Sequence, residues 1–217
     1  MIIFDIITLF PESFSYLKTS ILNKAQAKGL IKINFWDLKN FAPRHEIDDK
    51  PYGGGPGMVI KFQPVYSALT KAKKAFHTKK RKIILTHPAG KLFNQNLAKK
   101  LAQQKQIIII CGHYEGIDAR IEKFVDLKLS IGNYILTGGE LPAMVMIDAI
   151  SRHLKGVLHN PLSLEEKRYK QTLSYPVYTR PEIIQIKGRK LKTPKILLSG
   201  NHQSIKEWRL KKAKKII

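Results

Sequence analysis

The chain has 217 residues, of which 43% are hydrophobic and 25% are charged, a composition typical of a globular protein of one or two domains. Its formal net charge of +23 favours a polyanionic partner, and nucleic acid is the natural candidate. The single cysteine, Cys111, excludes an intrachain disulfide, and no apolar run reaches the ~18–20 residues of a membrane span. We therefore expect a cytoplasmic protein without a membrane partner.

Strand-like and helix-like segments alternate along the first 158 residues. Residues 2–9 are as dense in apolar side chains as a buried strand, and Pro11 opens a helix expected to run to Gly29. Residues 40–58 read as a loop. Further strands are predicted at 31–36, 82–86, 106–111 and 125–131, and further helices at 63–76, 92–104 and 140–153. This alternation predicts an α/β fold with a parallel sheet buried on both faces.

The character of the sequence changes after Leu158. We interpret 159–174, which are polar and proline-containing, as a flexible linker that follows a first domain at 1–158. Residues 175–217 are predicted to form a small, basic, mainly helical domain, with a helix at 205–213. Basic clusters at 71–82, 187–195 and 206–215 favour nucleic-acid binding, although an A/T-rich genome would also raise the lysine content.

Three apolar strands are followed by unusual loops: LTHPAG (85–90), CGHYEGID (111–118) and SIGNYILTGGE (130–140). Because the carboxyl ends of parallel strands meet at one edge of a sheet, these loops should converge on a small-molecule pocket. A plain strand-to-helix turn is the alternative reading of Gly138 and Gly139, and ordinary packing is the alternative for Tyr114 and Tyr134. The chain has no Walker or GxGxxG motif, no HExxH pair and no nucleophile elbow, which disfavours common nucleotide folds, a catalytic zinc and serine hydrolysis.

Five segments carry a resemblance to a known family: YGGGPGM (52–58), CGHYEGID (111–118), SIGNYILTGGELPAMVMIDAISR (130–152), YPVYTRP (175–181) and SGNHQSIKEWR (199–209). In this order they resemble the bacterial tRNA (guanine-37, N1)-methyltransferase family of the SPOUT superfamily. The resemblance implies a deep trefoil knot, a homodimer, S-adenosylmethionine as methyl donor and tRNA with guanosine 37 as substrate. It also implies that Mg²⁺ assists catalysis, although we expect no residue of this chain to form a metal site.

The resemblance further implies cofactor contacts in all three loops. Glu115 would act through its carboxylate, either on the cationic part of the cofactor or on a neighbouring loop, and a solvated surface glutamate is the alternative. The cofactor residues carried over from the family are Leu85, Thr86, Pro88, Gly112, Glu115, Ile131, Gly132, Asn133, Tyr134, Ile135, Leu136, Gly138, Gly139 and Leu141.

Methylation of guanine N1 requires a base, because N1 carries a proton, and negative charge then spreads onto O6. Arg152 matches the arginine that stabilises this oxygen in the family; the alternative is an arginine that meets the last carbonyls of a helix. The family's base is the aspartate of a Glu-Glu-Asp stretch, but this chain reads Glu165, Glu166, Lys167. Since a lysine ammonium accepts no proton, we expect Glu166 or Glu165 to replace it.

Two other positions depart from the family pattern: Asn133 replaces a common aspartate, and Lys50 replaces an arginine. The alternatives from other classes are a non-catalytic RNA-binding homologue that lost its base at Lys167 and a methyltransferase for ribosomal RNA. The residues expected to line the tRNA or cofactor side of a dimer are His45, Asp48, Asp49 and the loop 53–57, and the tRNA contacts expected from the small domain are Tyr178, Arg180, His202 and Lys206.

Overall fold

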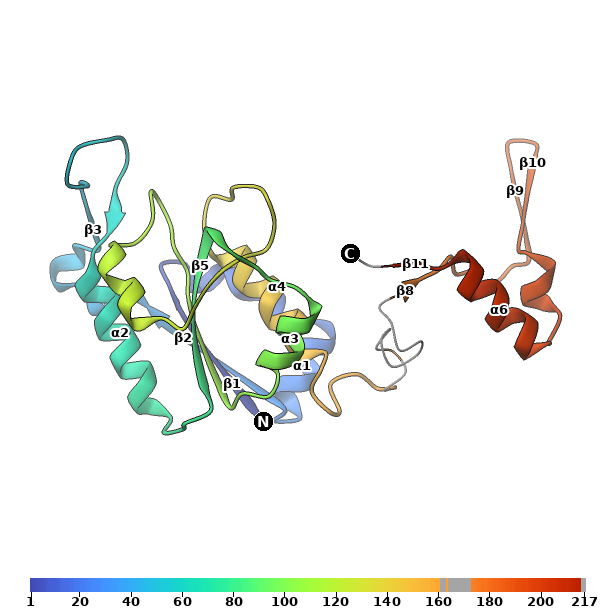
Figure 1. Ribbon diagram of the computed structural model, residues 1–217, viewed down its shortest axis with the longest axis horizontal. Helices are drawn as coiled ribbons and strands as arrows, with labels where there is room; N and C mark the ends of the chain where they lie inside the picture. Colours follow the sequence, from blue (N-terminus) through green and yellow to red (C-terminus); the bar gives the residue numbers. More distant parts are fainter. Residues whose placement is uncertain (161–162, 164–172, 216–217) are drawn as a thin grey trace. The chain divides into compact units, whose positions relative to one another are not determined.

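The computed structural model describes residues 1–160, 163 and 173–215, and it divides into two compact units, Met1–His159 and Asn160–Ile217 (Figure 1). None of the helices in these described ranges has the length and hydropathy needed to cross a bilayer. Each unit is described separately below.

The first unit is built on a five-stranded parallel sheet with the order β2-β1-β6-β5-β7. This sheet confirms the α/β class that the alternating pattern predicts. Two shorter strands, β3 and β4, pair antiparallel beside it. The strands are β1 (Ile2–Thr8), β2 (Ile31–Asp37), β3 (Asp48–Asp49), β4 (Val59–Ile60), β5 (Arg81–Leu92), β6 (Gln106–Ile110) and β7 (Leu127–Ser130).

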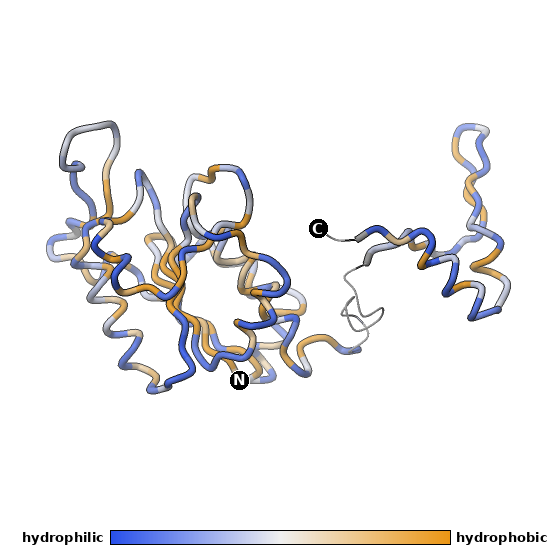
Figure 2. Tube along the Cα trace, in the orientation of Figure 1, coloured by the Kyte–Doolittle hydropathy of each residue, from blue (hydrophilic) through white to orange (hydrophobic). Residues whose placement is uncertain are grey.

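Helices cover both faces of the sheet, and the central strands β1 and β6 are buried at every position (Figures 1 and 2). In β6, Ile107 and Ile109 pack into the core beneath α1, α3 and α4, whereas Ile108 and Ile110 pack into the core beneath α2. The helices are η1 (Pro11–Lys18), α1 (Ser20–Ala27), η2 (Leu38–Phe41), η3 (Pro43–His45), α2 (Phe62–Ala75), α3 (Gln95–Leu101), η4 (Ala119–Phe124) and α4 (Glu140–Ser151).

Four predicted elements of this unit differ in the structure. The helix expected from Pro11 is split into η1 and α1, because Ser20 adopts a left-handed backbone with φ of +48°. The helix expected from 92 begins only at Gln95, since the Asn94 side chain accepts a hydrogen bond from the Leu97 amide at 3.0 Å and caps it. The expected loop at 40–58 contains η3 and β3.

The largest difference from the prediction is in β5, which was expected to end at 86 but continues through the predicted loop 85–90 as far as Leu92. Both Thr86 and Lys91 pair with Leu129 of β7, with a register shift between them, so the extra residues form an irregular bulge. A Cβ atom on Gly90 would lie 2.6 Å from the backbone nitrogen of Leu129, which explains why glycine is needed at this close approach.

The second unit contains strands as well as helices, and the predicted mainly helical domain is not confirmed. β9 (Ile183–Ile186) and β10 (Arg189–Lys192) form a hairpin whose turn residues, Lys187 and Gly188, have φ of +47° and +75°. The helix α6 begins at His202 rather than Ile205, because the Asn201 side chain caps the Ser204 amide at 3.1 Å. The remaining elements are β8 (Leu173–Ser174), η6 (Lys195–Leu198) and β11 (Lys214–Lys215), which pairs with β8.

Candidate active site

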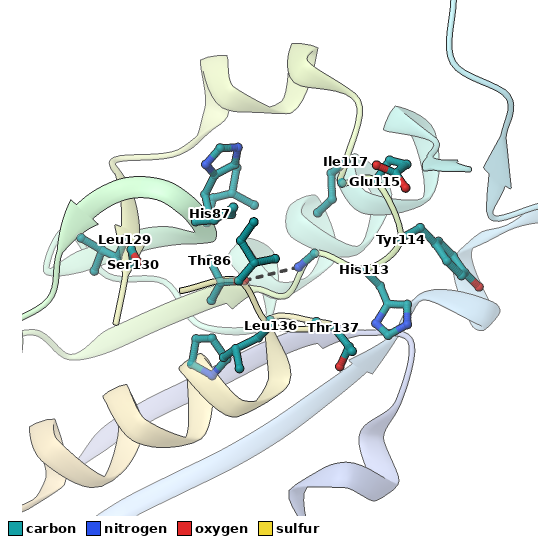
Figure 3. Close-up of a pocket in the computed structure, with 18 of the residues that line it drawn as sticks. Thr86, His87, His113, Tyr114, Glu115, Ile117, Leu129, Ser130, Leu136 and Thr137 are labelled. Atoms are coloured by element: carbon teal, nitrogen blue, oxygen red, sulfur yellow. Dashed lines mark hydrogen bonds between the residues drawn. The ribbon is translucent and has the colours of Figure 1, made fainter. Parts of the chain in front are cut away.

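A cavity of about 420 Å³ lies at the carboxyl edge of the sheet (Figure 3). It is bounded by the bulged part of β5, by residues 112–117 after β6 and by residues 129–139 between β7 and α4. The three loops that the sequence predicts at one sheet edge therefore meet. The volume of the cavity between them falls within the range of small-molecule sites, about 300–1,000 Å³.

Backbone contacts join two of these loops at Gly139. Its amide donates a hydrogen bond to the Gly112 carbonyl at 2.7 Å, and the Thr86 hydroxyl donates to the Ile110 carbonyl at 3.1 Å. A Cβ atom on Gly139 would overlap the Thr86 hydroxyl and lie 2.8 Å from the Cα atom of Cys111. Only glycine lets the chain that enters α4 pass this close to the end of β6.

The loop after β6 is held on its other side by residues 57–60. The Glu115 amide donates to the Met58 carbonyl at 3.0 Å, and the Ile60 amide donates to the Gly116 carbonyl at 2.9 Å. A Cβ on Gly57, whose φ is +77°, would lie 2.6 Å from the Glu115 Cγ atom. The glycine-rich segment 53–57 thus continues into the clamp that positions Glu115, whose side chain lines the cavity.

Beneath the cavity lies a buried carboxylate that the sequence reasoning did not identify. Glu140, 7% exposed, accepts a hydrogen bond from the Thr8 hydroxyl at 2.8 Å, and its second oxygen lies 3.9 Å from Nδ1 of His113. A Cβ on Gly138 would overlap this second oxygen and lie 2.7 Å from the same His113 nitrogen. Glu140 and His113 therefore support the Gly138 backbone from below, and Figure 3 shows His113 beside Thr137.

Cys111, the residue directly after β6, is also buried. Its burial, and secondarily the negative charge of Glu140, raise the pKa of the thiol well above its usual value. The thiol therefore stays protonated near neutral pH and does not act as a nucleophile.

Most of the residues carried over for the cofactor line this one cavity, but three do not. Leu141 is 55% exposed on the first turn of α4, and Gly132 and Asn133, in the turn after β7, are not among the lining residues. The predicted residues that line the cavity are Leu85, Thr86, Pro88, Gly112, Glu115, Ile131, Tyr134, Ile135, Leu136, Gly138 and Gly139. Lining residues that the sequence reasoning missed include His87, His113, Ile117, Ser130, Thr137 and Pro142; most are neighbours of predicted residues in the same loops.

The residues predicted to act on the guanine are Arg152, Glu165 and Glu166. Arg152 caps the C-terminal end of α4, and this 12-residue helix places it about 18 Å from Gly139 at the N-terminal end. Glu165, Glu166 and Lys167 lie outside the described residues. Within the described ranges, no three His, Cys, Asp or Glu side chains are grouped so as to hold a metal ion.

The residues predicted to line the tRNA or cofactor side of a dimer fall in η3 and β3. Asp48 and Asp49 form β3, which pairs with β4, and Lys61 lies 3.4 Å from the carboxylate of Asp49. The Lys50 amide, followed by Lys61, holds the pKa of Asp49 below its usual value. His45 is the last residue of η3.

In the second unit, Arg180, His202 and Lys206 are exposed. Tyr178 lies near Trp208, with ring centroids 6.3 Å apart, and the Arg209 guanidinium lies over the ring of Tyr175 at 5.4 Å.

Comparisons with known proteins agree with this geometry. The family model described as "tRNA (Guanine-1)-methyltransferase TrmD" matches residues 2–216. The chain is 49% identical over 214 residues to a tRNA (guanine-N(1)-)-methyltransferase of Carboxydothermus hydrogenoformans, covering 96% of this chain and 81% of the relative. It is 46% identical to the enzyme of that name from Dictyoglomus turgidum, covering 99% of this chain and 86% of the relative.

A solved structure of a tRNA methyltransferase is also similar to this chain. The crystal structure of tRNA (m1G37) methyltransferase from Aquifex aeolicus superposes with a TM-score of 0.80 at 41% identity, covering 96% of this chain and 88% of that one. Both the whole-length family match and this structural similarity lead to one conclusion. The chain belongs to the tRNA (guanine-1)-methyltransferase TrmD family.

Proposed function

We propose that this chain transfers a methyl group from S-adenosylmethionine to N1 of guanosine 37 in tRNA. The observation that carries the proposal is the cavity at Gly139, formed by three loops within a chain that matches the family over its whole length. The relatives carry enzyme names, which favours a catalytic protein over the non-catalytic RNA-binding alternative.

The cavity suits a bent sulfonium nucleoside. Leu85, Ile131 and Leu136 offer apolar surface for the faces of an adenine ring, while the Glu115 carboxylate supplies a negative charge for a cationic group. Gly138 and Gly139 allow the backbone to approach the ligand without a Cβ in the way. S-adenosylmethionine supplies, when bound, an electrophilic methyl group.

The chain's own residues would then manage the charge on guanine. The Arg152 guanidinium donates hydrogen bonds to O6, where negative charge develops as N1 loses its proton. Glu166, or Glu165 beside it, accepts that proton through its carboxylate, because Lys167 has no lone pair when charged. Mg²⁺, which the resemblance implies, would assist from the substrate side, since we propose no protein metal site.

A homodimer is part of this proposal, and the position of Arg152 supports it. About 18 Å of helix separates it from Gly139 in its own chain, so it would serve the cavity of a second copy. The exposed side chains Leu141 and Val145, four residues apart on α4, give this helix an apolar outer stripe suited to a symmetric contact.

Two finer proposals complete the assignment. The backbone at 131–139 would be threaded as part of a trefoil knot, as the resemblance implies. Residues 175–217 would bind the tRNA beyond a linker at 159–174, with Tyr178, Arg180, His202 and Lys206 in contact, in a cytoplasmic enzyme.

The direct test is nucleoside mass spectrometry of a tRNA transcript with guanosines 36 and 37, incubated with the protein and S-adenosylmethionine. We expect 1-methylguanosine at position 37, and a larger yield with Mg²⁺ than with a chelator. A transcript that stays unmethylated at saturating protein would overturn the proposal, and methylation of ribosomal RNA fragments instead would reassign the substrate.

A further inference from the structure

The parallel sheet gathers lysines from distant parts of the sequence at its amino edge, the edge opposite the cavity. We define this amino rim as Lys28, Lys32, Lys79, Lys80, Lys100 and Lys105, all of which are exposed. In Figure 1 the N-terminus and the C-terminal end of α2 lie at this end of the sheet, and Figure 2 shows that the turn between α2 and β5 is hydrophilic.

Backbone hydrogen bonds make the amino rim continuous. The Ile2 amide donates to the Leu30 carbonyl at 3.1 Å, and the Ile3 amide donates to the Lys105 carbonyl at 2.9 Å. The Lys105 amide donates in turn to the Lys80 carbonyl at 2.8 Å. Three segments far apart in the sequence, 28–32, 79–82 and 99–105, therefore present their lysines side by side.

Acidic residues are segregated from this rim. The segments 28–32, 77–82 and 99–106 contain no aspartate or glutamate, and the nearby Asp126 is paired with Lys82 at 3.3 Å. Six acids lie in segments at the other edge, Glu12, Asp37, Glu46, Asp49, Glu115 and Asp118, whereas Asp5 is buried within β1 and Asp148 lies in the last turn of α4.

This segregation has a consequence for RNA binding. The carboxylates of the cavity edge repel phosphates, so they add nothing to the affinity for a polyanion, whereas the amino rim offers lysines without neighbouring acids in its segments. The seven residues of β1 separate the two edges by about 20 Å, so an RNA seated on the rim does not obstruct the cavity of the same chain.

We infer that the amino rim docks the phosphate backbone of the tRNA body, outside the anticodon stem-loop. The inference rests on the proposed tRNA substrate and adds a second contact surface to it. Compact ammonium groups on flexible stems contact phosphates as point charges without reading the base sequence, and they release condensed counterions as they do so.

The test compares a full-length tRNA transcript with its isolated anticodon stem-loop, using the double variant Lys80→Gln/Lys105→Gln. We expect the affinity for full-length tRNA near physiological salt to fall about tenfold, and the slope of log K against log salt to lose about two units. Affinity for the stem-loop and for S-adenosylmethionine should stay at the wild-type level.

The matched control is Lys18→Gln/Lys39→Gln, which removes the same charge at two exposed lysines outside the rim. If the rim variant binds full-length tRNA like this control, or loses affinity equally for both RNAs, the inference is wrong. Failure of the proposed function would be seen separately, as wild-type protein that binds but does not methylate tRNA. Should the double variant not fold, the single variant Lys80→Gln answers the same question, with a loss of about one slope unit.

Discussion

Thr8 and Glu140 are 132 residues apart in sequence, yet the hydroxyl of one donates to the buried carboxylate of the other at 2.8 Å. This bond ties the end of β1 to the start of α4, directly below Gly138. It fixes where the last cofactor loop turns into its helix, so the floor of the cavity depends on it.

The variant Thr8→Val removes the donor while keeping the shape of the side chain. We expect unfolding free energy to fall by about 1–3 kcal/mol, since Glu140 loses a hydrogen bond in a buried site. The S-adenosylmethionine dissociation constant should rise several-fold as well. Urea denaturation measures the unfolding free energy, and calorimetry measures the dissociation constant. Thr8→Ser, which keeps the hydroxyl, should have wild-type values of both. Wild-type values in Thr8→Val would show that this hydrogen bond contributes to neither stability nor binding.

Gly139→Ala should disrupt the cavity more severely. The added Cβ collides with the Thr86 hydroxyl and the Cys111 backbone, which are fixed by the sheet, and an overpacked core site costs about 1–3 kcal/mol or more. We expect S-adenosylmethionine binding to be lost in calorimetry. Wild-type binding of S-adenosylmethionine by Gly139→Ala would contradict this account of the glycine.

The catalytic base is testable at three adjacent positions. Glu166→Gln should lower the single-turnover rate by about 10²–10⁴-fold if its carboxylate takes the N1 proton, with tRNA affinity little changed. Glu165→Gln serves as the comparison, and the larger loss identifies the base. A rate that rises by orders of magnitude in Lys167→Asp would show instead that the natural chain lacks an effective base.

Because we propose that Arg152 of one copy serves the cavity of the other, two inactive variants should restore activity when they form a mixed dimer. Arg152→Ala and Glu115→Gln should each be nearly inactive alone, because one removes the guanidinium and the other the cavity carboxylate. Mixed after unfolding and refolding together, they should recover about a quarter of the wild-type rate, since half of the dimers are mixed and each has one intact site. No recovery would place both residues in the site of one chain.

The raised pKa of Cys111 gives a pH-dependent prediction. A thiol whose folded pKa lies above its unfolded value stays protonated in the native protein until pH exceeds that raised value. Alkylation by iodoacetamide at pH 8 should therefore be slow in native protein and fast in urea, as followed by mass spectrometry. Rapid native labelling at pH 8 would contradict the buried, protonated thiol.

The sequence carries enough information to predict the layers of the first unit. The run Gln106–Ile110 is apolar at every position but the first, which matches a strand buried on both faces, and the loops after such strands meet at one edge as expected. Both features follow from the local hydrophobic pattern of the strands, which the tertiary structure retains because both faces of the sheet are buried.

Other features depend on contacts that no local pattern contains. Glu140 reads as an ordinary acid at a helix N-terminus, and its partner Thr8 is apparent only once β1 and α4 are packed together. Pro88 and Gly90 predict a loop, but pairing with Leu129 on β7 keeps that segment in the sheet. The hairpin of the second unit was missed because its second strand, Arg189–Lys192, is basic and resembles a solvated charge cluster.

Hydrogen exchange with and without S-adenosylmethionine tests the central claim most directly, because it locates the bound ligand on the chain. We predict slower amide exchange in peptides that cover 85–90, 112–117 and 131–139, with no change at the amino rim. Unchanged exchange in these three loops at saturating ligand, or protection confined to another part of the protein, would contradict the account.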